Sequence, residues 1–419
     1  MFETKETTVQ RALLVAVDTG EYDVEESLDE LAELARSAGA EVAARVTQRR
    51  ESFDPATCIG AGRLEEMADF IEADGANLII FDHELTASQL RNIEKACGCD
   101  VIDRTTLILD IFAQRATTSE GRLQVELAQQ RYRLPRLTGL GTSLSRLGGG
   151  IGTRGPGETK LESDRRHIRS RINSLERQLE TLARRRELMH TRRKKEGVVT
   201  VAIVGYTNVG KSTLLNRLTD AGVLSENMLF ATLDPTSRAL ELPDGRTVML
   251  VDTVGLVRRL PHHLVEAFKS TLEEAAQADL LLNVCDISSP EAEAHLQVTQ
   301  QLLKDLGAEN IPILTVLNKC DKLAYEPLDL GRNSVLISAQ TGYGIDALLQ
   351  SICRLLPATQ QRLTLLLPYA QGGLENHIVE TGGKIFSRDY TEEGILLDAL
   401  VDSKELHRVA EFVQRDPKG

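Results

Sequence analysis

The sequence predicts an α/β protein of several domains, in which mostly parallel sheets are flanked by helices, and three observations support this. Over the first hundred residues, short β-rich runs at 12–17, 77–82 and 100–103 alternate with helical stretches at 24–37 and 62–73. A similar alternation returns after residue 198. Strands that alternate with helices in this way are typical of parallel sheets. The third observation is length, because 419 residues exceed the usual size of one compact core.

We therefore expect four domains. They are an N-terminal α/β domain at 1–110, an antiparallel helical hairpin at 111–197, a central α/β domain at 198–358 and a small C-terminal domain at 359–419. The N-terminal domain shows no catalytic constellation. Gly60 and Gly62 ahead of Arg63 are interpreted as a tight turn rather than an anion site, and His83 as a structural residue.

Composition narrows the class of protein. Hydrophobic residues make up 42% of the chain and charged residues 26%, and no apolar run of about 18 residues exists that could span a bilayer. The first residues lack a basic segment ahead of an apolar run, so we expect no secretory signal. We predict a monomer in the cytoplasm and leave open its peripheral association with a membrane. The six scattered cysteines indicate reduced thiols rather than a metal site.

Charge is distributed unevenly along the chain. The formal net charge is −13, yet the segment from Arg122 to Lys195 holds 19 Lys and Arg against 7 Asp and Glu. A local excess of 12 positive charges on an acidic protein suits a nucleic-acid partner. A solvated helix surface is the alternative. Aromatic residues are scarce in this segment, so we expect contacts to phosphates rather than stacking on bases.

The basic segment is predicted to form two paired helices, from Leu107 to Leu137 and from Ser163 to Lys195. Apolar residues in the second helix follow a heptad seam of Ile168, Ile172, Leu175, Leu179, Leu182 and Met189, with Arg186 in one of its places. Thr159 and Glu162 form a capping box ahead of this helix. Between the helices lies a Gly-rich basic loop at 138–160, which is too long for a simple connection and is either a disordered linker or a functional tip.

The central domain opens with a phosphate-binding loop. The apolar run VVTVAIVG leads into GYTNVGKS and then into a helical stretch, which is the strand, loop and helix order that the loop requires. Backbone N–H groups are expected to hold the β-phosphate, Lys211 to reach the β and γ oxygens, and the Ser212 hydroxyl to ligate Mg²⁺. The predicted nucleotide-binding residues of this loop are Gly205, Tyr206, Thr207, Asn208, Val209, Gly210, Lys211, Ser212 and Thr213.

Three further loops follow apolar runs. In the first, Asp252 would hold Mg²⁺ through water and the Gly255 N–H would reach the γ-phosphate. In the second and third, the side chains would read the base, because the Asp321 carboxylate accepts from N1 and N2 of guanine and rejects adenine. The predicted residues are Asp252, Thr253, Val254 and Gly255, then Asn318, Lys319, Cys320 and Asp321, then Ser338, Ala339 and Gln340. Together the four loops predict GTP binding and hydrolysis, with GDP as product.

The segment that should contact the γ-phosphate and Mg²⁺ from the side lies between the phosphate-binding loop and Asp252. The residues Phe230, Ala231, Thr232, Leu233 and Asp234 are predicted to belong to it. Thr232 and Thr236 both offer a second hydroxyl for the metal ion. The residues alone do not choose between them.

Segments outside these motifs carry a resemblance to a known family. They are VIDRTTLILDIFAQRATTSEGRLQVELAQ at 101–129, GGGIGTRGPGETKLESDRRHIRSRI at 148–172 and LFATLDPTSR at 229–238. Over nearly its whole length the chain resembles the HflX family of translation-factor-class GTPases. The resemblance selects Thr232 as the metal ligand. It implies binding to the large ribosomal subunit and splitting or rescue of stalled ribosomes under stress.

The resemblance also suggests where contacts and catalytic groups lie. Candidate rRNA contacts are Arg146, Arg154 and Lys160, in the Gly-rich loop. Lys211, Thr232, Gly255 and Asn208 are the candidate catalytic residues, and Asn208 occupies the place of a K⁺ ligand in similar GTPases. Leu256 stands where many GTPases have a glutamine that orients water, so we expect slow intrinsic hydrolysis.

Two other functions remain open at this stage. One is a GTP-regulated switch that recruits a protein effector, with the paired helices as a protein-binding coiled coil. The other is a tRNA-modification GTPase, but the folate-binding domain and C-terminal cysteine motif of that class are not recognisable in the sequence.

Overall fold

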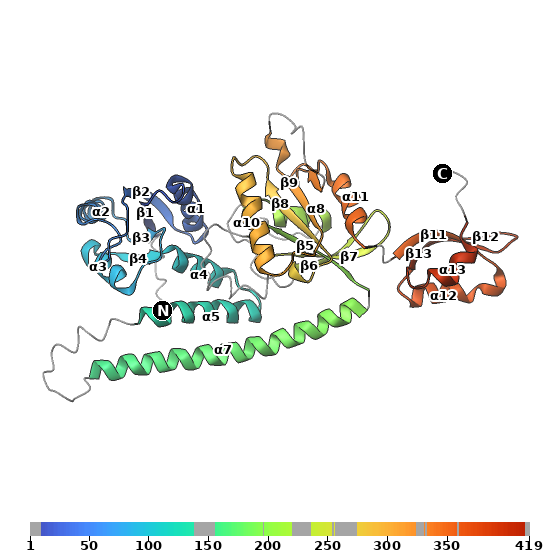
Figure 1. Cartoon of the computed structure of the whole chain (residues 1–419), viewed down its shortest axis with the longest axis horizontal. Helices are drawn as coiled ribbons and strands as arrows, with labels where there is room; N and C mark the ends of the chain where they lie inside the picture. Colours follow the sequence, from blue (N-terminus) through green and yellow to red (C-terminus); the bar gives the residue numbers. More distant parts are fainter. Residues whose placement is uncertain are drawn as a thin grey trace, which may run out of the picture. The chain divides into compact units, whose positions relative to one another are not determined.

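The structure is a computed structural model, drawn in Figure 1. It describes residues 10–137, 156–195, 197–219, 236–253, 255, 275–323, 331, 333–357 and 360–414. The chain divides into two compact units. One contains the N-terminal sheet, the helices that follow it and most of the long helix α7, and the other contains the remainder of α7 and the C-terminal half of the chain.

The N-terminal sheet has four parallel strands in the order β2-β1-β3-β4. The strands are β1 (Arg11–Asp18), β2 (Glu41–Arg49), β3 (Leu78–Phe81) and β4 (Asp100–Asp103), and the helices are α1 (Val24–Ser37), α2 (Ala61–Asp74) and α3 (Ala87–Cys97). This confirms the expected strands and helices and adds β2, which had not been predicted. Because β2 is an edge strand with most side chains half-exposed, it lacks a continuous apolar run.

The predicted helix from Leu107 to Leu137 is wrong as a single element. The structure has α4 (Arg104–Arg115) and α5 (Ser119–Arg136). The backbone is extended at Ala116, and the Thr118 hydroxyl accepts a hydrogen bond from Gly121 N at 2.9 Å, which starts a new helix. The buried Asp103 carboxylate accepts hydrogen bonds from the α5 residues Tyr132 and Arg136, and so ties α5 to the sheet.

Helix α7 (Pro156–Lys195) is longer than the sequence predicted. It starts at a proline, which is favoured in the first turn, so the predicted capping box of Thr159 and Glu162 is wrong because both residues lie inside the helix. Because α7 begins at Pro156, residues 156–160 at the end of the predicted Gly-rich loop are helical. The rest of that loop, 138–155, lies outside the described residues.

Helices α5 and α7 run antiparallel, as Figure 1 shows. Leu127 of α5 packs with Ile172 and Leu175 of α7, which are buried, and Ile168 and Leu179 are partly buried beside them. The heptad seam ends there. Met189 is 57% exposed because the 18 residues of α5 cannot cover the 40 residues of α7.

The central sheet has six strands in the order β10-β9-β8-β5-β7-β6, and all neighbours are parallel except β6 and β7. The strands are β5 (Val199–Gly205), β6 (Thr236–Glu241), β7 (Thr247–Asp252), β8 (Leu280–Asp286), β9 (Ile313–Asn318) and β10 (Ser334–Leu336). Helices α8 (Lys211–Thr219) and α11 (Ile345–Leu355) pack on one face, and α10 (Ala292–Asp305) packs on the other.

The C-terminal segment forms a small antiparallel sheet in the order β11-β13-β12. Its elements are β11 (Gln360–Leu367), α12 (Gly373–Glu380), β12 (Lys384–Tyr390), β13 (Ile395–Asp402) and α13 (Leu406–Val409). Leu397, Ala399 and Val401 of β13 form the centre of its core. Among the helices of the described ranges, none is long and apolar enough to cross a membrane.

Candidate functional site

Three parallel strands of the central sheet end at the loops that were predicted to bind the nucleotide. Strand β5 ends at Gly205, β7 at Asp252 and β9 at Asn318. Asp252 lies in register with Ile203 of β5. Because the carboxyl ends of parallel strands meet at one edge, the structure brings together the loops that were predicted to bind the phosphates, the metal ion and the base.

The phosphate-binding loop needs its glycines. Gly205 has a φ of 150°, and a Cβ there would lie 2.2 Å from the carbonyl oxygen of Val284. Gly210 has a φ of 94°, and a Cβ there would lie 2.5 Å from Asn318 Nδ2. Asn208, which is exposed, adopts a left-handed φ of 60°. The loop therefore turns tightly and presents backbone N–H groups at the start of α8, where an anion is favoured.

Lys211 is the buried cation of the site. Its Nζ donates to the carbonyl oxygens of Gly205 at 3.1 Å and Tyr206 at 2.7 Å. Burial lowers the pKa of Lys211 to about 8, although the nearby Asp252 carboxylate opposes the shift. A buried ammonium group that donates to two neutral carbonyl oxygens can also bind an anion, which would balance its charge.

Gly255 completes the cradle around Lys211. A Cβ on Gly255 would lie 2.7 Å from Thr207 Cγ2 and 3.0 Å from Lys211 Nζ. Only a glycine can therefore bring its backbone this close to the ammonium group. The Thr207 hydroxyl is buried beside it without a hydrogen-bond partner among the described residues.

The residues that should hold Mg²⁺ lie together. Ser212 Oγ donates to Asp252 Oδ2 at 3.1 Å, and Asp252 is fully buried. A hydroxyl and a carboxylate are the oxygen ligands that Mg²⁺ prefers, and it usually keeps several waters and binds substrate phosphates as well. The donor set therefore fits the ion.

Asn318 links the predicted phosphate-binding loop to both loops that were predicted to read the base. Its Nδ2 donates to the carbonyl oxygen of Val209 at 2.7 Å, and its Oδ1 accepts from Ala339 N at 2.9 Å. Beside it, Lys319 Nζ lies 2.7 Å from Asp286. Burial raises the pKa of Asp286, but the hydrogen bonds from Lys319 and Ser288 outweigh it, and the net pKa lies below the ordinary value.

The other residues that were predicted to read the base also follow the carboxyl ends of strands in the central sheet. Asp321 lies in a short 3₁₀ turn (Cys320–Lys322) with an exposed side chain, whereas Ser338 and Ala339 are buried. Arg217 of α8 donates to the carbonyl oxygens of Ala339, at 3.0 Å, and Gln340. Sequence reasoning missed Arg217 because one arginine on a helix carries no motif.

Several predicted residues lie outside the described part of the chain. They are Phe230, Ala231, Thr232, Leu233, Asp234, Val254, Leu256, Arg146 and Arg154, and for Lys160, which lies in α7, the side chain is not described. The other predicted nucleotide residues are described and belong to the four loops.

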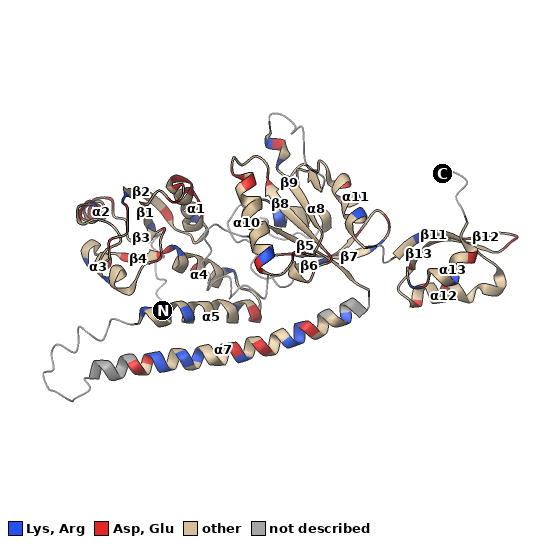
Figure 2. Ribbon diagram, in the orientation of Figure 1, with Lys and Arg blue, Asp and Glu red and all other residues tan. Residues whose placement is uncertain are grey.

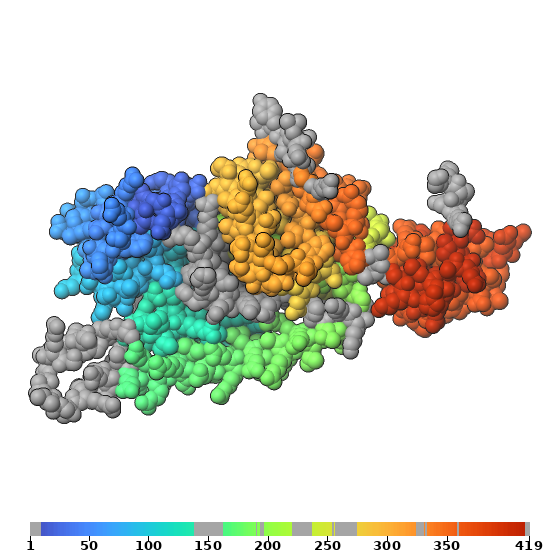
Figure 3. All heavy atoms as spheres, in the orientation of Figure 1, coloured from blue at the N-terminus to red at the C-terminus, as the bar shows by residue number. Residues whose placement is uncertain are grey.

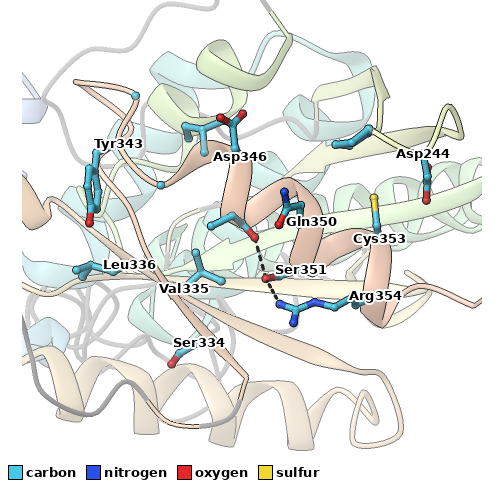
Figure 4. A pocket seen from close by; sticks show the side chains of 15 residues that line it. Asp244, Ser334, Val335, Leu336, Tyr343, Asp346, Gln350, Ser351, Cys353 and Arg354 are labelled. Atoms are coloured by element: carbon cyan, nitrogen blue, oxygen red, sulfur yellow. Dashed lines mark hydrogen bonds between the residues drawn. The ribbon is translucent and has the colours of Figure 1, made fainter. Parts of the chain in front are cut away.

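A groove of about 1060 Å³ lies elsewhere on the central domain, beside α11 (Figure 4). Strand β10, the Tyr343 loop and the α11 side chains Gln350 and Arg354 line it. It contains no predicted nucleotide-binding residue. The phosphate-binding site is therefore distinct from this groove.

Comparison with known proteins agrees with the loop geometry. Family models match residues 25–113 (GTP-binding GTPase N-terminal), 115–193 (GTP-binding GTPase Middle Region) and 200–319 (50S ribosome-binding GTPase). GTPase HflX of Caldanaerobacter subterraneus subsp. tengcongensis is 52% identical over 96% of this chain and 94% of its own. GTPase HflX of Escherichia coli is 44% identical over 94% and 93%. The chain belongs to the HflX family.

Membership in the HflX family makes the chain a GTP-binding protein and a GTP hydrolase. A GTP-binding protein of Sulfolobus solfataricus, solved in complex with GDP, is 26% identical over 83% of this chain and 98% of its own, with a TM-score of 0.46.

We expect GTP affinity to fall as the pH rises through the pKa of Lys211. The free protein loses the Lys211 proton near pH 8, and the phosphates bind its charged form, so affinity is full well below pH 8 and declines above it. The protonated fraction predicts about a fourfold loss between pH 7 and 8.5. Isothermal titration in two buffers of different ionisation enthalpy should show proton uptake at pH 8.5. Equal affinity at both pH values without proton uptake would contradict the assignment.

Proposed function

We propose that this HflX-family GTPase binds the large ribosomal subunit in its GTP state and splits or rescues stalled ribosomes. The carrying observation is the excess of 12 positive charges from Arg122 to Lys195, in the segment of the α5–α7 hairpin and its Gly-rich loop. RNA phosphates dominate affinity for such a surface. The description 50S ribosome-binding GTPase of the model for residues 200–319 supports the same partner.

The residue roles proposed for the nucleotide follow the placement of the loops. Lys211 binds the β and γ oxygens, the Gly255 N–H binds the γ-phosphate, and Ser212 with Asp252 holds Mg²⁺, the latter through water. Mg²⁺ would neutralise charge on the phosphates as the bond to the leaving oxygen breaks. Thr232 supplies the second metal hydroxyl. Asn318, Asp321 and the Ser338–Gln340 loop bind guanine.

The proposed domain boundaries are 1–110, 111–197, 198–358 and 359–419. The first two family-model matches end at 113 and 193, near the first two boundaries, and the third match begins at 200, near the start of the central domain. We further propose a cytoplasmic monomer whose loop at 138–160 contacts rRNA through Arg146, Arg154 and Lys160.

Replacing Asp321 by Asn should shift the preference from guanine to xanthine nucleotides. The amide donates where the carboxylate accepted, and so matches the C2 carbonyl of xanthine. Titration calorimetry with GTP and XTP measures the change, which should exceed tenfold in relative affinity, since each unpaired polar group costs about 1–3 kcal/mol. The neighbouring Lys322→Asn serves as a control and should leave selectivity unchanged. Unaltered selectivity in Asp321→Asn would mean that this loop does not read the base.

Potassium should stimulate hydrolysis moderately, because the exposed Asn208 with its left-handed backbone can offer its side-chain oxygen to a monovalent cation beside the phosphates. Single-turnover assays in matched potassium and sodium chloride measure this. The stimulation should disappear in Asn208→Ala. Equal rates in both salts for the unaltered protein would rule out the cation site.

Neutralising Arg146, Arg154 and Lys160 together with glutamine should weaken binding to the large subunit and flatten its salt dependence by about one unit of slope per lost phosphate contact. GTP affinity should not change, because these residues lie outside the nucleotide loops. Co-sedimentation with purified subunits at several salt concentrations tests this, with a GTP analogue or GDP bound.

If the unaltered protein binds no better with the analogue than with GDP, the GTP-dependent function is wrong. If the triple variant binds equally well at every salt concentration, the loop is not the contact. RNase-insensitive co-sedimentation with a protein would then favour the effector-recruiting switch.

A further inference from the structure

One side of α7 carries arginines and, among its described side chains, no acidic residue. A helix turns about 100° per residue. This phase places Ser163, Arg166, His167, Ser170, Ser174, Arg177, Thr181, Arg184, Arg185, Leu188 and Arg192 on one sector, and every one of these side chains is exposed. The buried seam residues Ile172 and Leu175 lie on the opposite side. We call the sector the arginine stripe.

The acidic residues of α7 lie outside the arginine stripe. Glu176 pairs with Arg131 of α5 at 2.8 Å. The arginine of α7 that pairs with Glu126 of α5, at 2.6 Å, is Arg171, which is also outside the stripe. Figure 2 shows positive and negative bands alternating along α7 as a whole. The acidic residues of α7 are therefore kept off the stripe, and the two α5–α7 ion pairs named here, Arg131–Glu176 and Arg171–Glu126, use residues outside it.

The length and chemistry of the stripe suit a phosphate backbone. Arg166 and Arg192 are 26 residues apart, which corresponds to about 39 Å along a helix that rises 1.5 Å per residue. Figure 3 shows atoms of α7 at the surface along much of this helix. Arginine forks and small hydroxyls are the side chains that contact phosphates most often, and the stripe has no Phe, Tyr or Trp on which a base could stack.

We propose that the arginine stripe binds the phosphate backbone of double-helical RNA, separately from the loop at 138–160. Duplex RNA presents its phosphates as continuous ridges and is recognised mainly by shape and phosphate contacts. The inference rests on the proposed ribosomal function for the identity of the RNA, which would be a helix of ribosomal RNA. Binding to a duplex as such can be measured without the ribosome.

The test uses the full chain with Arg166→Gln, Arg177→Gln and Arg185→Gln combined. The matched control combines Arg36→Gln, Arg91→Gln and Arg169→Gln, which removes the same charge from exposed positions outside the stripe, the last of them on α7 itself. The probe is a fluorescent RNA duplex of about 16 base pairs, the span of a double-stranded RNA-binding domain. Anisotropy is recorded over a series of salt concentrations, and unchanged GTP affinity and circular dichroism verify folding.

The stripe variant should bind the duplex at least about tenfold more weakly than the unaltered protein, and its slope of log affinity against log salt should be smaller by about two to three units. The control should change the slope by less than one unit. Equal losses in both variants, or no duplex binding by the unaltered protein, would overturn the proposal.

Co-sedimentation of the same variants with large subunits separates the two proposals. Failure of the unaltered protein to sediment with subunits contradicts the ribosomal function, whatever the duplex assay shows. Normal duplex binding by the stripe variant contradicts the role of the stripe, even if the ribosomal function holds.

Discussion

The carboxyl edge of the central parallel sheet is the constraint on which the rest of the site depends. Gly205 passes so close to the carbonyl of Val284 on β8 that a side chain there would collide with it, and this fixes where the phosphate-binding loop leaves β5. From that point Asn318 joins the loop to the end of β9 and to Ala339. The predicted phosphate-binding and base-reading loops are therefore held together by one close backbone approach and by the side-chain hydrogen bonds of Asn318.

The distribution of charge differs between the carboxyl edge of the central sheet and the α5–α7 segment, and this difference suits two separate functions. At the carboxyl edge of the central sheet, Lys211 is the buried lysine among the described residues, and its burial favours an anion as its partner. The α5–α7 segment instead holds many exposed positive charges on an otherwise acidic chain. Binding of phosphates by exposed charges weakens as the salt concentration rises. Binding of phosphates by the buried Lys211 instead depends on its protonation, and so on pH. The two functions should therefore respond to different solution conditions.

The sequence predicted the nucleotide loops because each combines an apolar strand with residues of restricted chemistry, such as Gly205, Asp252 and Asn318. Sequence reasoning gave wrong or incomplete results where a single local contact, which leaves no recognisable pattern in the sequence, decides the structure. Thr118 divides one expected helix into two with a single capping hydrogen bond, and Pro156 starts α7 seven residues earlier than the seam suggested. Edge strand β2 and the contact from Arg217 to Ala339 depend on packing that no linear pattern records. The arginine stripe could not be recognised from the sequence alone. The buried residues that pack against α5 had to be known before the opposite face of α7 could be identified.

We propose that the carboxyl edge of the central sheet binds and aligns GTP, and that a group outside this chain positions the attacking water. Leu256, which follows Gly255 in the sequence, has an apolar side chain and cannot orient water. Single-turnover hydrolysis with and without purified large ribosomal subunits tests this most directly. Slow hydrolysis by the protein alone and a marked acceleration by saturating subunits is the predicted result. Rapid hydrolysis by the protein alone, or a slow rate that the subunits leave unchanged, would contradict it.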